Sequence, residues 1–275
     1  MKRALVALAK KFGFAVLHDS PDPLLRDLLV THGSLRLGGT APLRCDDPLS
    51  RLAFDFRLRH LLRHFAIDLV VDIGANRGQF AQTVRRLGFA GDIVSFEPIA
   101  GHAEELSNLA RADGRWQVHR LALGATEGTL PLLVYSASTF SSFHRVNDTG
   151  ATEFSDSTKI DHVEQVPVRP LDALWPEITG GRKRRVLIKS DTQGHEREVI
   201  AGARQALAAA LVVLAEASVV PIYEDSAGFD ELRSMLAREN YLLSALFPIY
   251  TRPSDFALIE MDCFFVRADA NGAIT

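Results

Sequence analysis

The sequence predicts an α/β fold built around a mostly parallel, doubly wound sheet. Short apolar runs rich in valine, isoleucine and leucine alternate with segments of helical periodicity, a pattern typical of strands joined by crossover helices. Most of these runs are apolar throughout, as expected of strands that are covered on both faces. The last two runs have no helix between them, which predicts an antiparallel pair at one edge of the sheet.

Residues 1–65 are predicted to form a helical N-terminal extension, and residues 66–275 the α/β domain. The extension begins with a basic amphipathic segment, Lys2–Leu17, which we expect to pack on the domain; weak contact with a membrane surface is the alternative. A short helix is expected at Leu24–Val30, before turns rich in proline and glycine. Apolar residues at helical spacing predict a further helix over Arg51–Phe65.

The elements of the α/β domain then follow in order. Strands are predicted at Leu69–Asp72, Ile93–Phe96, Val118–Ala122, Val186–Lys189 and Leu211–Leu214, and the closing pair at Leu242–Phe247 and Cys263–Val266. Helices are predicted at Gly78–Leu87, Gly101–Ala112, Glu196–Ala210 and Phe229–Glu239. This order places the carboxyl ends of the parallel strands along one edge of the sheet, where ligands bind in open α/β folds.

One polar stretch, Ser136–Ile160, does not fit a simple crossover. It lies between predicted strands at Gly128–Tyr135 and His162–Val168, and such long loops are usually functional or mobile. Hydroxyl residues alternate with phenylalanines over 138–143, and His144 follows directly. Because aromatic faces with hydroxyl donors suit a sugar, the stretch is a candidate lid or substrate loop. A solvated loop anchored by two phenylalanines is equally compatible with the pattern.

Composition and charge exclude several classes of protein. With 47% hydrophobic residues, 31 basic and 34 acidic side chains and a pI near 6.3, the chain is neither disordered nor strongly basic, and we expect no nucleic-acid partner. The apolar stretch Ala4–Ala9 is too short for a signal peptide, and none approaches the ~20 residues that cross a bilayer. Cys45 and Cys263 are neither a close pair nor spaced for metal binding, so we expect reduced thiols in a cytoplasmic protein.

The first strand ends in a glycine-rich turn of unusual chemistry. The turn reads Asp72-Ile-Gly74-Ala75-Asn76-Arg-Gly78. Glycines let the backbone approach a ligand closely and turn tightly into the next helix. The phosphate-binding patterns Gly-x-Gly-x-x-Gly and Gly-x-x-x-x-Gly-Lys-Ser/Thr are both absent from it. An acid two residues before the first glycine favours a ligand that carries positive charge and no phosphate.

Two further strand ends face the same crevice. Glu97 follows the second strand, and a carboxylate there can accept hydrogen bonds from both hydroxyls of a ribose. Pro98 ends that strand and stiffens the turn. After the third strand, Ala122 and Leu123 are residues beside which an adenine could lie.

A polar cluster follows the fourth strand and reads Lys189-Ser-Asp191-Thr-Gln-Gly-His195-Glu196. Capping of the following helix accounts for one of its acids, and Glu196 can be the acid that starts this helix. It does not account for Lys189, Asp191, His195 and Glu196 together. We therefore expect this cluster to belong to a functional site, with Lys189, Asp191 and His195 as its candidate catalytic residues.

Metal binding is not expected from the sequence. Glu216, after the fifth strand, could bind a divalent ion together with Asp191, but two acids without a third form a poor ligand set. His60 and His64 have the i, i+4 spacing of metal ligands, but no His-Glu-x-x-His pattern accompanies them. We interpret both as surface histidines.

Taken together, these motifs resemble those of the FkbM-type S-adenosylmethionine-dependent methyltransferases. The residues that carry the resemblance are 72–78, 96–98, 171–172, 188–196 and 199–202. The resemblance covers about residues 66–267 and implies a Rossmann-like, seven-stranded methyltransferase fold with S-adenosyl-L-methionine as cofactor. It also implies methyl transfer to a hydroxyl of a sugar, glycolipid or related natural product. Ser190 departs from the family pattern, which commonly has an aliphatic residue before the aspartate.

This cofactor agrees with the residues. It offers a ribose to Glu97 and an α-ammonium that Asp72 can help to orient, and it carries a sulfonium and no phosphate. By the resemblance, Asn76 and the amides from Gly74 to Gly78 would hold its amino-acid end. An alcohol acceptor must lose a proton, and Asp191 and His195 are the candidate bases, with imidazole favoured near neutral pH. Lys189 could orient Asp191 or the acceptor.

Two other functions compete with an O-methyltransferase. A non-catalytic module that binds S-adenosyl-L-methionine would not need the cluster of Asp191 and His195. A nicotinamide-dependent dehydrogenase would need a phosphate-binding turn, which the turn after Asp72 is not. The expected partner is a small-molecule or glycan acceptor, and the sequence leaves open which hydroxyl is methylated and whether the chain forms a homo-oligomer.

Overall fold

The computed structural model describes residues 48–268. The expected helices at Lys2–Leu17 and Leu24–Val30, together with Cys45, lie outside the described residues. The chain divides after Arg57, and the unit Leu58–Thr275 contains the strands of both sheets described below.

Helix α3 (Pro48–His64) is the first described helix and corresponds to the helix predicted over Arg51–Phe65. The division after Arg57 falls within it, whereas we expected the domain to begin at residue 66. No helix among residues 48–268 is both long and apolar enough to cross a bilayer.

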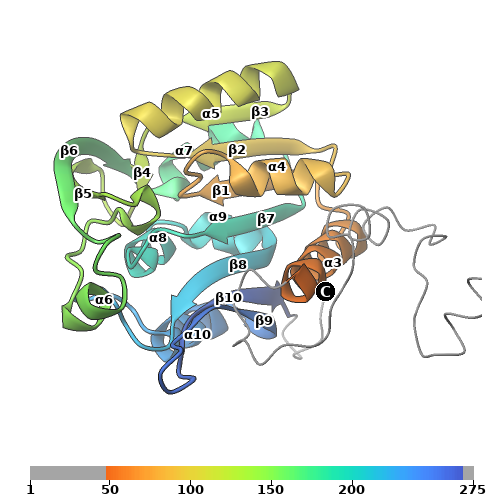
Figure 1. Ribbon diagram of the computed structural model, residues 1–275. Coiled ribbons are helices and arrows are strands. Elements are labelled where there is room, and N and C mark those ends of the chain that lie inside the picture. The colour runs from red at the N-terminus through yellow and green to blue at the C-terminus, as the bar shows by residue number, and fades with distance from the viewer. Residues whose placement is uncertain (1–47, 269–275) are drawn as a thin grey trace, which may run out of the picture. The chain divides into compact units, whose positions relative to one another are not determined.

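The main sheet has seven strands in the order β3-β2-β1-β7-β8-β10-β9 (Figure 1). In that order their bounds are Trp116–His119, Asp92–Phe96, Leu69–Ile73, Val186–Ser190, Ala210–Ser218, Leu258–Arg267 and Tyr241–Thr251. The first five pair in parallel, and β10 pairs antiparallel with both β8 and β9. The predicted fold class is therefore confirmed, including the antiparallel pair at one edge.

Strand β1 lies between β2 and β7 and is parallel to both. The chain continues from β1 to β2 and β3 on one side, and returns later to β7 and β8 on the other. Such a point, where the strand order reverses, opens a crevice outside the carboxyl ends of the strands. The predicted site residues after β1, β2 and β7 follow these ends.

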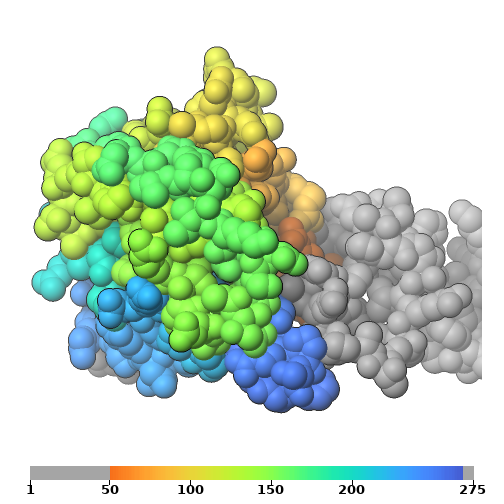
Figure 2. All heavy atoms as spheres, turned by 60° about the vertical axis from the view of Figure 1, so that its left-hand side comes forward, coloured from red at the N-terminus to blue at the C-terminus, as the bar shows by residue number. Residues whose placement is uncertain are grey.

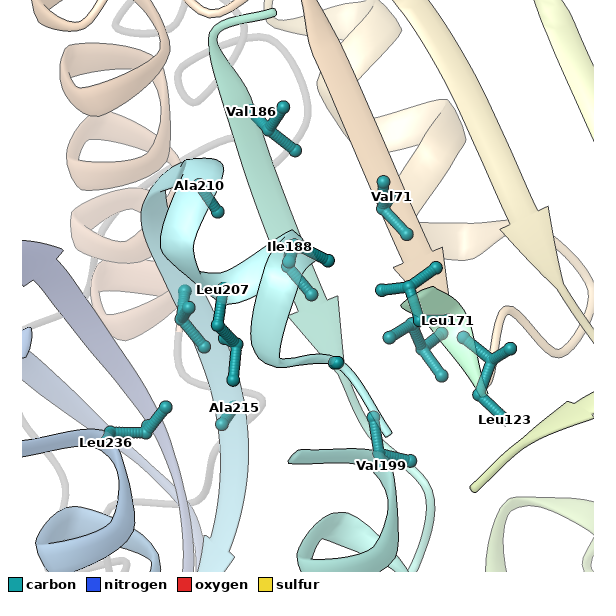
Figure 3. Packing of buried hydrophobic residues seen from close by; sticks show 14 of the residues in the cluster. Val71, Leu123, Leu171, Val186, Ile188, Val199, Leu207, Ala210, Ala215 and Leu236 are labelled. Carbon is teal, nitrogen blue, oxygen red and sulfur yellow. The ribbon is translucent and has the colours of Figure 1, made fainter. Parts of the chain in front are cut away.

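Helices lie on both faces of this sheet (Figure 1). Their bounds are α4 Gln79–Arg86, α5 Ala100–Asp113, α7 Leu171–Thr179, α8 Glu196–Ala201, α9 Arg204–Ala209 and α10 Phe229–Arg238. Figure 3 shows one face, where Val71 and Ile188 of the sheet pack with Leu171, Val199 and Leu236 of the helices. Since side chains alternate along a strand, the neighbouring residues of β1 and β7 point to the opposite face.

The helix predicted over Glu196–Ala210 is wrong in one respect, because the chain breaks it into α8 and α9. At Gly202 a Cβ atom would lie 2.0 Å from the backbone oxygen of Gly124, so the chain turns where another backbone touches it. Asp172 of α7 then accepts hydrogen bonds from the amides of Gln205 and Ala206 at 2.9 and 3.0 Å. A side chain distant in sequence thus caps the second helix.

The predicted third strand is also split. The main-sheet strand β3 ends at His119, and Ala122 begins β4 (Ala122–Leu123) in a second sheet of order β4-β6-β5. In that sheet β5 (Gly128–Tyr135) and β6 (Ile160–Arg169) pair antiparallel, which confirms both predicted strands.

The polar stretch Ser136–Ile160 is more regular than a loop. It contains a 3₁₀ turn η2 (Ser138–Phe140) and helix α6 (Asp148–Glu153), which the Asn147 side chain caps by accepting from the Gly150 amide at 3.0 Å. Phe140 and Phe154 pack with buried residues after β8. Residues 128–169, drawn in green, cover much of the face seen in Figure 2.

Candidate functional site at the carboxyl ends of β1, β2 and β7

The turn after β1 lies directly against the turn after β7. Gly74 has a φ of +71°, and a Cβ atom there would stand 1.9 Å from the backbone oxygen of Asp191. Only glycine satisfies both conditions, since it tolerates positive φ and leaves room for the second backbone. Gly74 therefore brings the two halves of the crevice into contact.

The amides of this turn all donate within the chain. Those of Gly74 and Ala75 donate to the Phe96 oxygen at 3.1 and 3.0 Å, and that of Gly78 to the Ala75 oxygen at 2.8 Å. The Arg77 amide donates to the Asn76 side chain at 2.9 Å. We expected these amides to hold the amino-acid end of the cofactor; in this structure they hold the turn itself. They also leave no free nest of amides for a pyrophosphate, which counts against a dinucleotide.

Glu97 is fixed by the backbone on both sides. Its two carboxylate oxygens accept from the amides of Asn76 and Ile99 at 2.7 and 2.8 Å. The residue is 4% exposed, and burial raises the pKa of Glu97 to about 7 despite these two hydrogen bonds. A carboxylate oxygen can accept more than one hydrogen bond, so the anchored group still offers lone pairs to a ligand hydroxyl. Pro98 is half-buried beside it.

His102 is a neighbour of Glu97 that the sequence analysis did not find. Its Nδ1 lies 3.9 Å from a Glu97 carboxylate oxygen, and burial lowers the pKa of this imidazole. It lies in the first turn of α5, the helix that follows Glu97. The signal available in the sequence was a histidine at the start of the helix that leaves a candidate ribose-binding acid.

A buried cation joins the two halves of the crevice. The Lys189 Nζ lies 3.3 Å from carboxylate oxygens of both Asp72 and Asp191, and donates to the Gly74 oxygen at 2.8 Å. Asp72 is fully buried, and burial raises its pKa, while the Lys189 charge opposes this shift. Burial lowers the pKa of Lys189, but the two carboxylates outweigh this effect and leave it raised. Asp72 thus has Lys189 as its cation in this structure, whereas we predicted contact with a ligand ammonium.

On the β7 side, a network of side chains surrounds Asp191. The Gln193 amide nitrogen donates to Asp191 and to Glu216, at 2.9 Å each, and the Tyr223 hydroxyl donates to the Gln193 side-chain oxygen at 2.8 Å. Burial and the neighbouring carboxylates raise the pKa of Glu216 well above its ordinary value. The Asp191 side chain is one-third exposed, so a ligand can reach it.

Glu196 has the structural role that we allowed for it. Its carboxylate accepts hydrogen bonds from the amides of Thr192 and Gly194 at 2.8 and 3.0 Å and so fixes the turn before α8. Gln193 and Gly194 in this turn both have positive φ. Of the acids in the cluster that follows β7, Glu196 therefore stabilises the turn, and Asp191 is left to act in the crevice.

The His195 side chain is buried in the structure. It is 6% exposed, and its ring packs against Phe143 at a centroid distance of 4.6 Å. Burial, with a smaller contribution from His144, lowers the pKa of His195 to about 4. Ala122 and Leu123 are also buried, and their side chains pack into two hydrophobic clusters. All three side chains are buried, as is that of Glu97.

Comparison with known proteins bears on what this crevice does. The sequence model described as the Methyltransferase FkbM domain matches residues 72–243, which span the turn after β1, Glu97 and the Asp191 network. The chain belongs to the FkbM methyltransferase family. This family assignment confirms the predicted class of enzyme, with S-adenosyl-L-methionine as the methyl donor.

Solved structures of similar fold have low sequence identity to this chain. A methyltransferase FkbM from Methylobacillus flagellatus KT is 18% identical with a TM-score of 0.45, and the match covers 72% of this chain and 43% of that one. The magnesium protoporphyrin IX methyltransferase from Synechocystis PCC 6803 is 11% identical with a TM-score of 0.44, covering 89% and 96%. The chain therefore spans less than half the length of the Methylobacillus protein. No curated protein matches the sequence.

The charges of the crevice fit this cofactor. Glu97 and Asp191 are acids that follow the carboxyl ends of β2 and β7, and the nearby cation Lys189 is already paired with two acids. Such a site attracts the sulfonium and the ammonium and repels a phosphate. The residues that would hold the cofactor are Glu97 for the ribose, and Asn76 and Asp191 for the rest of the molecule.

Proposed function

We propose that the protein is an S-adenosyl-L-methionine-dependent O-methyltransferase that acts on a hydroxyl of a sugar, glycolipid or related natural product. The observation that carries this proposal is the Asp191 carboxylate, held by Lys189 at 3.3 Å and by Gln193 at 2.9 Å, with one-third of its side chain exposed. A fixed, accessible carboxylate can accept the proton that an alcohol loses. When bound, the cofactor supplies an electrophilic methyl group.

Of the two candidate bases, the structure favours Asp191. From the sequence we favoured His195 as the base, because an imidazole normally titrates near neutral pH. Burial lowers the pKa of His195 to about 4, which removes that advantage, and the ring is 6% exposed. Asp191 is accessible and is oriented from two sides. Holding the acceptor oxygen in line with the methyl group supplies a large part of the rate in such reactions.

The remaining polar groups of the network suit an acceptor with several hydroxyls. Gln193, Glu216 and Tyr223 are joined by hydrogen bonds, and the polar stretch 136–160 reaches them through Ser142, whose hydroxyl donates to the Gln193 backbone oxygen at 2.5 Å. Carboxylate and amide groups recognise sugar hydroxyls, and the buried Tyr223 hydroxyl orients the Gln193 side chain.

Methyl transfer from labelled cofactor tests this proposal. The purified chain is incubated with S-adenosyl-L-methionine labelled in the methyl group and with matched acceptors that offer a sugar hydroxyl, a glycolipid hydroxyl or an amine. We expect label in an ether product, and Asp191→Asn to lower kcat by about 10²–10⁴-fold. Transfer to nitrogen alone would reject O-methylation. A greater loss of kcat in His195→Gln than in Asp191→Asn would reject the choice of base.

A further inference from the structure

Three polar side chains outside the methyl-transfer network converge on one point. His144 comes from the polar stretch, His195 from the start of α8 and Glu198 from its first turn. One nitrogen or oxygen atom from each residue lies within 4.8 Å of those of the other two. The His195 Nδ1 and the Glu198 Oε2 are 3.5 Å apart, and the two imidazole rings are 5.7 Å apart between centroids.

The atoms that converge are buried and unsatisfied. The His144 Nε2, the His195 Nδ1 and the Glu198 Oε2 are all inaccessible to solvent, and none has a hydrogen-bond partner among residues 48–268. Buried polar atoms are paired in the great majority of cases, and a group that is not paired calls for an explanation. Three such atoms on neighbouring residues call for a common explanation.

We propose that His144, His195 and Glu198 bind a transition-metal ion, with Zn²⁺ the best match to their chemistry. Two imidazoles and one carboxylate form a recurrent zinc ligand set, and Mg²⁺ and Ca²⁺ prefer oxygen ligands. Tetrahedral Zn²⁺ with bonds of about 2.0–2.2 Å places its ligand atoms roughly 3.4 Å apart. The separation of 3.5 Å between the His195 and Glu198 atoms agrees with this spacing.

The backbone around the site holds His144 in place. The Ser142 hydroxyl donates to the Gln193 oxygen at 2.5 Å and accepts from the His144 amide at 3.0 Å, so the polar stretch is attached to the turn that carries His195. Phe143 packs against the His195 ring from the same stretch. An ion bound here fastens residues 142–144 to the first turn of α8. Three protein ligands leave one position on a tetrahedral ion for water.

This assignment revises two expectations from the sequence. No metal was expected, because Asp191 and Glu216 are two acids without a third; in the structure Gln193 donates a hydrogen bond to each of them. His195 also becomes a ligand in place of a base. The proposal does not depend on which acceptor the enzyme methylates.

Zinc binding by the full chain, prepared without a histidine tag, tests the proposal. The chain is stripped with a chelator and titrated with Zn²⁺ against a chromophoric competitor. We expect one tight site per chain, lost in His144→Ala and in Glu198→Gln. Losing an outer-shell partner already weakens metal binding by about 10–100-fold, so removal of a ligand is expected to weaken it by at least ~100-fold.

The matched control is the double variant His60→Gln/His64→Gln. These histidines lie at i, i+4 on the exposed side of α3 and would report zinc bound to a surface. We expect this variant to retain the tight site. Equal zinc affinity in the wild type, His144→Ala and Glu198→Gln overturns the proposal, as does the absence of a tight site in the wild type.

A second measurement guards against a variant that does not fold. His144 lies outside the helices and strands, so His144→Ala removes a ligand without changing a regular element. Co²⁺ added to the stripped wild type is expected to give the intense visible absorption of a four- or five-coordinate ion, and His144→Ala to abolish it. A weak spectrum of octahedral Co²⁺ in the wild type contradicts the site.

Discussion

The two sides of the crevice fix their carboxylates in different ways. At the β1–β2 side, Glu97 is held by two backbone amides that lie within 21 residues of it in sequence. At the β7–β8 side, Asp191 and Glu216 are held by the Gln193 side chain, which is held in turn by Tyr223. The backbone of the turns sets the position of Glu97. Side chains set the positions of Asp191 and Glu216, and such side chains can differ between enzymes that bind different substrates.

This difference agrees with a division of labour in the proposed enzyme. The cofactor is the same molecule in each turnover, so a carboxylate that backbone amides hold rigidly can serve as the binding site for its ribose. An acceptor differs between enzymes of similar fold, and exchange of side chains alters what is bound without altering the sheet. Lys189 forms one contact between the two sides, because it pairs with Asp72 and Asp191 at once.

The largest expected effect comes from breaking that contact. Lys189→Met leaves Asp72 fully buried without its cation, and removal of one partner from a buried pair costs about 3–5 kcal/mol. Denaturant unfolding measures this loss. The control is Arg77→Met, which removes an exposed pair with Glu105 and is expected to cost no more than about 1 kcal/mol. Equal losses in both variants would show that Lys189 does not join the two sides.

The close approach of the two turns is the next to test. In Gly74→Ala, a Cβ atom meets the Asp191 oxygen and the residue must hold a positive φ, which together cost about 3 kcal/mol. In Gly101→Ala no atom lies within 4 Å of the new Cβ, and this control is expected to change stability by less than ~1 kcal/mol. Equal shifts of the unfolding curves of Gly74→Ala and Gly101→Ala would refute the close contact between the two turns.

The pH dependence of stability tests the burial of Glu97. Its folded pKa, about 7, lies above the ordinary value of 4.5, so the folded state binds the proton more tightly. The resulting stabilisation is complete below pH 4.5 and is lost as the pH rises through about 7. A shift of this size is worth on the order of 3 kcal/mol. The free energy of unfolding of wild type minus that of Glu97→Gln is expected to fall over this range; a flat difference would contradict the shifted pKa.

The smallest effect is expected from the network on the acceptor side. Tyr223→Phe removes the hydrogen bonds to Gln193 and the Phe140 oxygen and is expected to cost about 1–2 kcal/mol. Tyr241→Phe is a matched control, since its buried hydroxyl also donates to two acceptors. We expect similar losses of stability, but a lower rate of methyl transfer in Tyr223→Phe alone. A similar fall in the rate of methyl transfer in both variants would show that Tyr223 has no specific role in the site.

The same contrast explains how much could be predicted from the sequence. The strands, the turn after Asp72 and the acid at Glu97 leave local patterns, and apart from the split third strand the positions of these elements were predicted correctly. The break between α8 and α9 was missed because its cause lies elsewhere in the chain, in the backbone of Gly124 and the carboxylate of Asp172. Helix α7 was missed because Pro176 interrupts its helical pattern.

The candidate site divides in the same way. Glu97 and Asp191 could be found because each follows a strand at the carboxyl edge. The roles of Gln193, Tyr223 and Ser142 could not, because these residues meet only after segments far apart in sequence fold together. Lys189 was found, but its pairing with Asp72 depends on the register of β1 against β7, which a single sequence does not specify.

The affinity of S-adenosyl-L-methionine for Glu97→Gln tests the central claim most directly. Calorimetry at pH 8 compares the wild type, Glu97→Gln and the control Glu231→Gln, an exposed acid of α10 paired with Arg197. Hydrogen bonds to a charged acceptor contribute about 1.5–3 kcal/mol each, so we expect Glu97→Gln to weaken binding by at least about tenfold and the control to match the wild type. Unchanged affinity in Glu97→Gln would contradict the placement of the cofactor at the β1–β2 side.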